Sequence, residues 1–286
     1  MTTIPSSPSS FAFQPDEKVD QGFLRVLEQL TIQARRITRH SHSKVSDPVH
    51  DARVLIKRLR ALLWFASPAF STPEMNRAKS HLREASQLLA AQRDLVVMRS
   101  ILQMLSRKTR NSCYRKTLVR IARAQDHRQP FPDKTDRSLP QAVAIILATI
   151  KQIKKKANIS FEWPSSSDRL AQAFLSTKKS GKKALHGDDP AQFHDWRKKA
   201  KRLLYQLQLA QADPGKRMAH IIKGIDKLQE KLGDYHDSVI AQERLRKMLP
   251  EKIEPLLLRH SLNFLEKRKN RLRIKVRKIA NYIKSK

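Results

Sequence analysis

The chain has 286 residues, and its 59 Lys and Arg against 26 Asp and Glu give a formal net charge of +33 at pH 7. A positive field of this size favours a polyanionic partner, such as nucleic acid, an acidic membrane or polyphosphate. The single cysteine, Cys113, excludes an intramolecular disulfide, a Cys-based zinc ribbon and an Fe–S cluster, and six glycines argue against a Gly-rich phosphate loop.

The chain is predicted to be all-α, beginning with a lead-in at 1–15 that is rich in Ser and Pro and is expected to be disordered. From Asp16 on, apolar residues recur three and four positions apart, the spacing of one helix face. Asp47-Pro48 predicts the start of a helix that runs to about Ala66, and Thr72 is expected to cap the next one.

A Pro-containing segment at about 129–138 is the predicted linker between two helical halves, about 16–128 and about 139–286. In the second half, a loop is expected over 158–167. The helices expected after it are 168–186, one that starts at Asp189-Pro190, 214–232, 234–249 and about 251–284.

An internal repeat is the strongest local signal. His50-Asp51-Ala52-Arg53 and Lys57-Arg58-Leu59 recur 144 positions later as His194-Asp195-Trp196-Arg197 and Lys201-Arg202-Leu203. Both copies follow an Asp-Pro helix start at nearly the same distance. The pattern indicates duplication of a helical unit and predicts a pseudo-twofold arrangement.

Each repeat places its cations on one helix face and its leucines on the opposite face. The first stripe contains His50, Arg53, Lys57 and Arg60, with Arg58 on its flank; the second contains His194, Arg197 and Lys201, with Lys198 and Arg202 beside it. No acid falls within 52–66 or 196–212. Unpaired cations so close together repel one another unless a polyanion neutralises them, although a solvated helix face remains the alternative.

These motifs resemble the CHAD family, the conserved histidine α-helical domain, over about residues 16–286. A second pair of segments adds to the resemblance, Leu88–Asp94 and Lys231–Asp237. The resemblance implies two four-helix bundles with a basic groove between them, binding of inorganic polyphosphate, association with polyphosphate granules, and no catalytic activity or cofactor. The binding residues that it implies are His50, Arg53, Lys57, Arg58, Arg60, Arg93, His194, Arg197, Lys198, Lys201 and Arg202.

The sequence also allows functions other than polyphosphate binding. Nonspecific nucleic-acid binding is the main alternative, although aromatic residues are only 6% of the chain and are not interleaved with the cations. No catalytic constellation or metal-ligand spacing is found. The very basic C-terminal segment is interpreted as the last bundle helix, with a membrane-surface or nucleic-acid arm as the alternative. The single cysteine, the lack of a long apolar stretch and the N-terminal composition predict a cytoplasmic protein.

Overall fold

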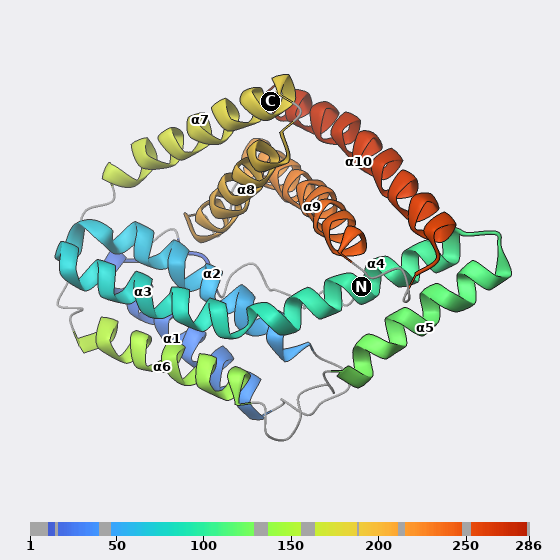
Figure 1. Ribbon diagram of the computed structural model, residues 1–286. Helices are drawn as coiled ribbons and strands as arrows, with labels where there is room; N and C mark the ends of the chain where they lie inside the picture. The colour runs from blue at the N-terminus through green and yellow to red at the C-terminus, as the bar shows by residue number, and fades with distance from the viewer. Residues whose placement is uncertain are drawn as a thin grey trace. The chain divides into compact units, whose positions relative to one another are not determined.

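The structure, a computed structural model, describes residues 11–14, 17–39, 47–128, 137–155, 164–187, 189–210, 215–247 and 253–284, without the side chains of 91–95, 124–128, 164–167 and 284 (Figure 1). Every regular element in these ranges is helical, which confirms the all-α prediction. The helices are α1 (Val19–Arg39), α2 (Pro48–Ala66), α3 (Thr72–Leu88), α4 (Ala90–Lys108), α5 (Ser112–Arg128), α6 (Ser138–Lys155), α7 (Pro164–His186), α8 (Pro190–Ala210), α9 (Gly215–Arg246) and α10 (Pro255–Lys284), with a 3-10 turn at Ser67–Ala69.

The two Asp-Pro helix starts are confirmed. Asp47 caps α2 and accepts a hydrogen bond of 2.9 Å from the backbone N–H of His50. Asp189 does the same for α8, where its carboxylate accepts the N–H of Ala191 at 2.8 Å. In both cases a carboxylate satisfies a backbone donor that the first helical turn leaves unpaired.

Two other predicted boundaries are wrong in the described residues. The N-cap of α3 is Ser71 rather than Thr72, because the Glu74 carboxylate reaches back to accept the Ser71 N–H at 3.1 Å and forms a capping box. The α7 helix already begins at Pro164, within the loop predicted over 158–167. Residues 158–163 of that loop lie outside the described residues.

The predicted break between 232 and 234 does not occur, because α9 runs unbroken through Gly233 from Gly215 to Arg246. A glycine inside a helix costs about 1 kcal/mol relative to alanine. Burial of Leu228, Leu232 and Tyr235 on the same helix offsets that cost. Local sequence signals for a turn are therefore overridden by tertiary packing here.

The chain divides into two compact units, and each unit takes segments from both sides of the predicted linker. Unit 1 comprises the described residues of Met1–Ala91, Arg137–Ser176 and Lys201–Ile222, and unit 2 those of Gln92–Asp136, Thr177–Ala200 and Lys223–Lys286. Helices α7, α8 and α9 each contribute one end to either unit. The predicted duplication into two four-helix bundles, with a groove between them, stays a prediction.

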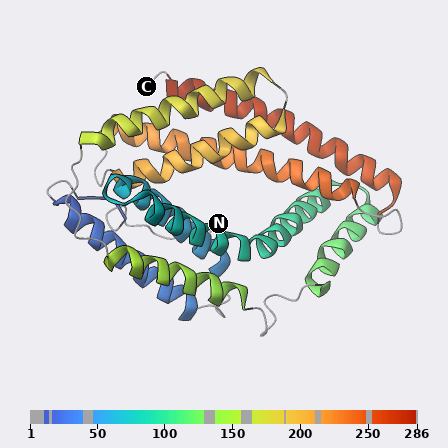
Figure 2. The ribbon, with the colours of Figure 1, turned by 60° about the vertical axis from the view of Figure 1, so that its left-hand side comes forward.

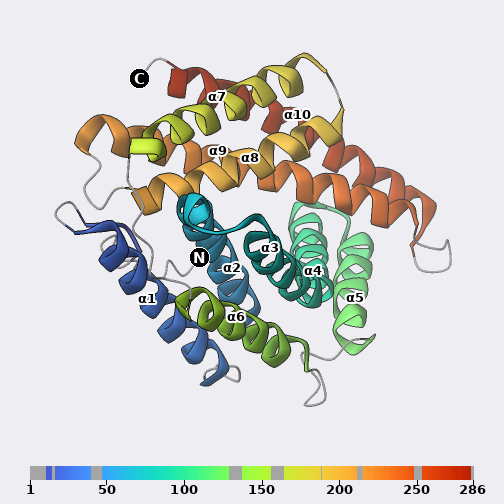
Figure 3. The ribbon, with the colours of Figure 1, turned by 90° about the vertical axis from the view of Figure 1, so that its left-hand side faces the viewer.

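Unit 1 is built around α1, α2, α3 and α6, which pack on one another; Figures 2 and 3 show α1 and α6 side by side. Its core contains side chains that are fully buried, among them Phe23, Leu30, Leu59, Leu82 and Ile146. Each such side chain contributes about 1.5–3 kcal/mol of hydrophobic stabilisation. The leucines of α2 therefore form the core, as the projection of the first repeat predicts.

Residues 11–14 also belong to the core of unit 1, so the predicted disordered lead-in extends too far toward its C-terminal end. Phe11 and Phe13 are only 6% and 4% exposed. Arg25 holds this segment by donating to the Ala12 carbonyl at 2.7 Å and to the Glu17 carboxylate at 2.6 Å. The hydrogen bond from Arg25 keeps the pKa of Glu17 below its usual value. Two aromatic side chains thus fix a stretch whose composition alone suggests disorder.

Buried side chains gather in at least two places among the described residues of unit 2. Helices α4, α5, α9 and α10 share a core that includes Leu102, Leu118, Leu245 and Leu265. A second, aromatic group joins α8 to α9, where the rings of Phe193 and Tyr235 stack with their centroids 4.4 Å apart. Figure 2 shows the helices of this unit from α7 to α10 in yellow to red.

Candidate anion-binding sites

Arg60 on α2 is held by uncharged oxygen atoms. Its Nη2 donates to the Leu82 carbonyl at 2.9 Å and to the Ser86 hydroxyl at 3.1 Å, both on α3. Neither acceptor carries a charge, so the contacts orient the guanidinium and leave its positive charge uncompensated. Other arginines are paired with a carboxylate, as in the 2.6 Å contact between Arg25 and Glu17, and some, such as Arg277, also donate to uncharged oxygens.

Three further arginines surround Arg60 electrostatically. Burial lowers the pKa of Arg60, and the charges of Arg83, Arg202 and Arg53 lower it further. Because a guanidinium remains protonated at any physiological pH, the four side chains concentrate positive charge rather than titrating. Arg53 is oriented in a similar way, with its Nη1 donating to the Leu89 carbonyl at the end of α3 at 3.4 Å. We call Arg53, Arg60, Arg83 and Arg202 the arginine cluster of unit 1.

The arginine cluster contains residues from both predicted basic helices and one residue that was not predicted. Arg53 and Arg60 come from the first basic helix, and Arg202 comes from the second, whose final part from Lys201 on belongs to unit 1. Arg83, an exposed residue of α3, belongs to none of the repeated motifs and was therefore not predicted. Its placement opposite α2 depends on tertiary packing, which no local motif encodes.

The other predicted residues of α2 lie in different surroundings. Arg58 turns toward α1, where its Nη1 donates to the Gln33 amide oxygen at 3.0 Å. Its guanidinium also lies 5.1 Å from the ring centroid of Phe11 in the N-terminal segment. Burial lowers the pKa of Arg58. Lys57 lies with its Nζ 6.0 Å from the ring centroid of Tyr205 on α8, and His50 is exposed in the first turn of α2. The structure therefore separates Arg58 from the arginine cluster.

In unit 2, His194 on α8 packs against His236 on α9. Their ring centroids are 4.4 Å apart, and the ring planes are tilted by 37°. Burial lowers the pKa of His194, and the nearby charges of Lys198 and Arg197 lower it further. Burial and these cations therefore favour the neutral form of His194, while the charge of Asp195 acts in the opposite direction.

Cations of α8 surround this histidine pair. Lys198 is exposed. Arg197 reaches α9 beside Gly233, and the Nε atom of Arg197 would lie 3.7 Å from a Cβ atom added to that glycine. His194, Arg197 and Lys198 thus lie together at one end of α8, while Lys201 and Arg202 belong to unit 1. The side chain of the remaining predicted residue, Arg93, lies outside the described side chains.

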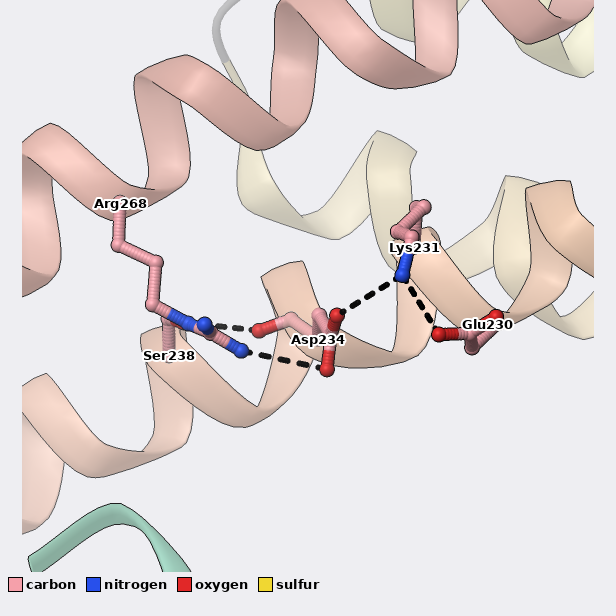
Figure 4. A network of polar contacts seen from close by, with 5 residues as sticks. All are labelled: Glu230, Lys231, Asp234, Ser238 and Arg268. Atoms are coloured by element: carbon pink, nitrogen blue, oxygen red, sulfur yellow. Dashed lines mark hydrogen bonds and ion pairs between the residues drawn. The ribbon is translucent and has the colours of Figure 1, made fainter. Parts of the chain in front are cut away.

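A network between α9 and α10 shows how other cations of unit 2 are neutralised (Figure 4). Asp234 pairs with Arg268 at 3.2 Å and with Lys231 at 3.8 Å. Arg268 also donates to the Ser238 hydroxyl at 3.2 Å, and Lys231 contacts Glu230 at 2.5 Å. Because carboxylates already compensate Arg268 and Lys231, these two side chains are poorer candidates for binding an external anion than Arg60 or Lys198.

Within the described ranges, no group of three or more His, Cys, Asp or Glu residues is arranged to hold a metal ion. None of the helices, as far as they are described, has the length and hydrophobicity needed to cross a bilayer. The arginine cluster and the histidine pair offer positive charges and hydrogen-bond donors.

The chain is similar to a known protein family and to two curated proteins. The family model for the CHAD domain matches residues 23–246. Two uncharacterized proteins of Mycobacterium tuberculosis, from strains CDC 1551 / Oshkosh and H37Rv, are each 25% identical to this chain over 258 residues, which cover 85% of it. The matched region covers 47% of each of these proteins, so the chain spans about half the length of the curated relatives it matches.

Proposed function

The chain belongs to the CHAD-domain family, and from that premise we propose that it binds inorganic polyphosphate through its basic helices α2 and α8. The CHAD domain is associated with polyphosphate binding. The observation that carries the proposal for this chain is the arginine cluster of unit 1, where Arg60 is oriented by neutral oxygens and the charges of three other arginines act on it.

Polyphosphate suits such a cluster because it carries regularly spaced negative charges and no bases. The forked donors of a guanidinium match phosphate oxygens, and bound phosphate would relieve the repulsion between the arginines. Release of counterions drives binding of this kind, so affinity should fall steeply with salt. The proposed function is binding without catalysis. Binding to polyphosphate would localise the protein at polyphosphate granules.

Nucleic acid is the competing ligand, and the placement of the tryptophans argues against it. Binding of single strands relies on aromatic side chains on which bases stack. Trp196 is only 2% exposed, and Trp64 is covered by Arg169, whose guanidinium lies 4.3 Å from the ring centroid. Neither of these two indoles offers an open face beside the basic stripes, and their placement favours a ligand without bases. The third tryptophan, Trp163, lies outside the described residues.

A competition assay at near-physiological salt tests the proposal. Labelled long-chain polyphosphate is bound to the protein and challenged with duplex DNA, single-stranded RNA and short phosphates. We expect polyphosphate to survive a charge-matched excess of either nucleic acid. Displacement on a charge-for-charge basis would mean that the net charge of +33 acts as a generic field, and nucleic-acid binding would then replace our proposal.

Polyphosphate affinity is also expected to depend on pH. In the free protein, burial and nearby cations keep the pKa of His194 below its ordinary value, so the ring is neutral at pH 7.5. A bound phosphate favours the protonated ring, so binding takes up a proton and strengthens as pH falls. Between about pH 7.5 and 6 we expect affinity to rise about three- to tenfold.

His194→Gln tests this expectation and should make polyphosphate affinity nearly independent of pH. His186→Gln, which changes an exposed histidine of α7, is the control and should leave the pH dependence unchanged. Fluorescence anisotropy with labelled polyphosphate at constant ionic strength gives the affinities. An unchanged pH profile in His194→Gln would remove this histidine from the binding site.

A further inference from the structure

The cations of α10 fall into two groups. Those that face the rest of unit 2 make contacts there: Arg268 pairs with Asp234, Arg273 lies 5.8 Å from the Phe193 ring centroid, and Arg277 donates to the Leu185 carbonyl at 3.3 Å. A second group is exposed and has no hydrogen-bond or ion-pair partner in the described part of the chain: Arg259, Lys267, Arg271, Lys275 and Lys278. Packing within unit 2 therefore does not explain the second group.

Four of these exposed cations form one stripe: Lys267, Arg271, Lys275 and Lys278. At 3.6 residues per turn they fall within an arc of about 80°, and they extend about 16 Å along the helix. The only acid of α10 is Glu266, and its carboxylate is already used by Lys269 at 2.9 Å and by the Gln242 amide at 3.0 Å. The stripe therefore presents positive charge with no acid to balance it.

Exposed apolar side chains lie on the same face as the cations. Leu256 is 61% exposed and Ile274 is 58% exposed, and both fall within about 20° of Lys267 on the helix projection. Tyr282, which is 45% exposed, lies at the other edge of the same arc. A single exposed leucine needs no explanation, but two aliphatic side chains and a tyrosine aligned with four unpaired cations form a surface of mixed chemistry.

We propose that this face of α10 binds the surface of a membrane that contains anionic lipids. Lysine and arginine bind lipid phosphates and carboxylates, aliphatic side chains enter the boundary between headgroups and acyl chains, and tyrosine prefers that interface. Polyphosphate has no apolar part and would leave Leu256 and Ile274 unexplained. Because α10 lacks the hydrophobicity to span a bilayer, the helix would lie on the membrane surface.

Co-sedimentation of the full chain with lipid vesicles tests this proposal. The vesicles are phosphatidylcholine alone or phosphatidylcholine with about one third phosphatidylserine, at about 0.15 M salt. The variant Lys267→Gln/Arg271→Gln/Lys275→Gln/Lys278→Gln should lower the partition coefficient for the anionic vesicles at least about tenfold. Both vesicle types should bind the variant about equally weakly.

The matched control removes four exposed cations from α5 and from the short segment that precedes it. Its set is Arg110, Lys116, Arg120 and Arg123, which share no face with an exposed large apolar side chain in the described residues. Replacement of this α5 set by glutamine lowers the net charge equally and should change vesicle binding less than about threefold. An equal loss in both variants would show that only the total charge matters and would overturn the proposal.

A second pair of variants tests the apolar contribution. Ile274→Ser should weaken binding to the anionic vesicles about three- to tenfold, since burial of the side chain at the interface is lost. Leu24→Ser changes an exposed leucine on α1 that is flanked by Asp20 and Glu28, and it should have no effect. Equal affinity of Ile274→Ser and the unaltered protein would contradict insertion of the aliphatic side chains.

Polyphosphate binding, measured on the same proteins, separates this proposal from the proposed function. The α10 variant should keep its polyphosphate affinity within about twofold, since the arginine cluster and the histidine pair are intact. If the variant loses both ligands together, the α10 face is part of the polyphosphate surface and the membrane proposal falls. If the unaltered protein does not bind anionic vesicles at all, the membrane proposal fails while polyphosphate binding can still stand.

Discussion

Replacement of Arg53, Lys57, Arg197 and Lys201 together by alanine is expected to lower the affinity for polyphosphate at least about 100-fold. Each side chain would donate charge-assisted hydrogen bonds to phosphate, and even a modest loss at each of four positions reaches this factor. The salt dependence of binding should also become shallower, because fewer counterions are released. Titration of labelled polyphosphate at several salt concentrations measures both quantities.

The control for this variant is replacement of the α5 set by alanine, which lowers the net charge by the same amount. It should weaken binding only slightly, less than about threefold. Circular dichroism must show unchanged helicity in both variants, since Arg53 also donates to the end of α3. If the quadruple variant of α2 and α8 binds as tightly as the unaltered protein, the stripes are only solvated helix faces.

Replacement of Trp196 by alanine is expected to destabilise unit 2 by about 3–5 kcal/mol, the usual cost of removing a buried tryptophan. Trp196 is 2% exposed and packs directly on Gly181, where an added Cβ would lie 2.7 Å from the indole. Phe193 packs beside it, with ring centroids 6.3 Å apart. Removal of the indole would leave a cavity, and the apolar groups that line it would lose their dispersion contacts with the ring.

Guanidinium denaturation followed by circular dichroism gives the free energy of unfolding for this variant. Trp196→Phe serves as the control, because it keeps most of the apolar volume and should cost clearly less. A loss below about 1 kcal/mol in Trp196→Ala would contradict the buried position of the indole. The outcome matters for the site as well, because the same helix carries His194 and Arg197 on its other side.

Sequence alone predicted the features that depend on neighbouring residues. The Asp-Pro starts of α2 and α8 are local, since one carboxylate caps the turn that follows it, and both are confirmed. The predicted break at Gly233 was also a local signal, but packing of the residues around it keeps α9 continuous. The helical projection likewise identified the buried leucines of α2 and the burial of Trp196 on α8.

The partners of the cations could not be predicted in this way. The projection of α2 indicates which side Arg60 lies on, but its acceptors, Leu82 and Ser86, belong to another helix. Arg58 contacts Phe11 in a segment that composition assigns to disorder. Arg83 joins the arginine cluster, and His236 pairs with His194, only because of tertiary packing. Such contacts depend on which helices meet, and a single sequence does not encode that locally.

The interleaving of the two units along the chain has a consequence for the order in which the protein can fold during synthesis. Phe13, near the start of the chain, donates its backbone N–H to the carbonyl of Leu209 at 2.9 Å, and Leu209 is itself fully buried in the core of unit 1. A nascent chain that has emerged only as far as α6 still lacks this partner. Helices α1, α2, α3 and α6 can pack on one another before then, but unit 1 is completed only after α8 has left the ribosome. Until that moment, the part of the core that receives Leu209 lacks its partner from α8.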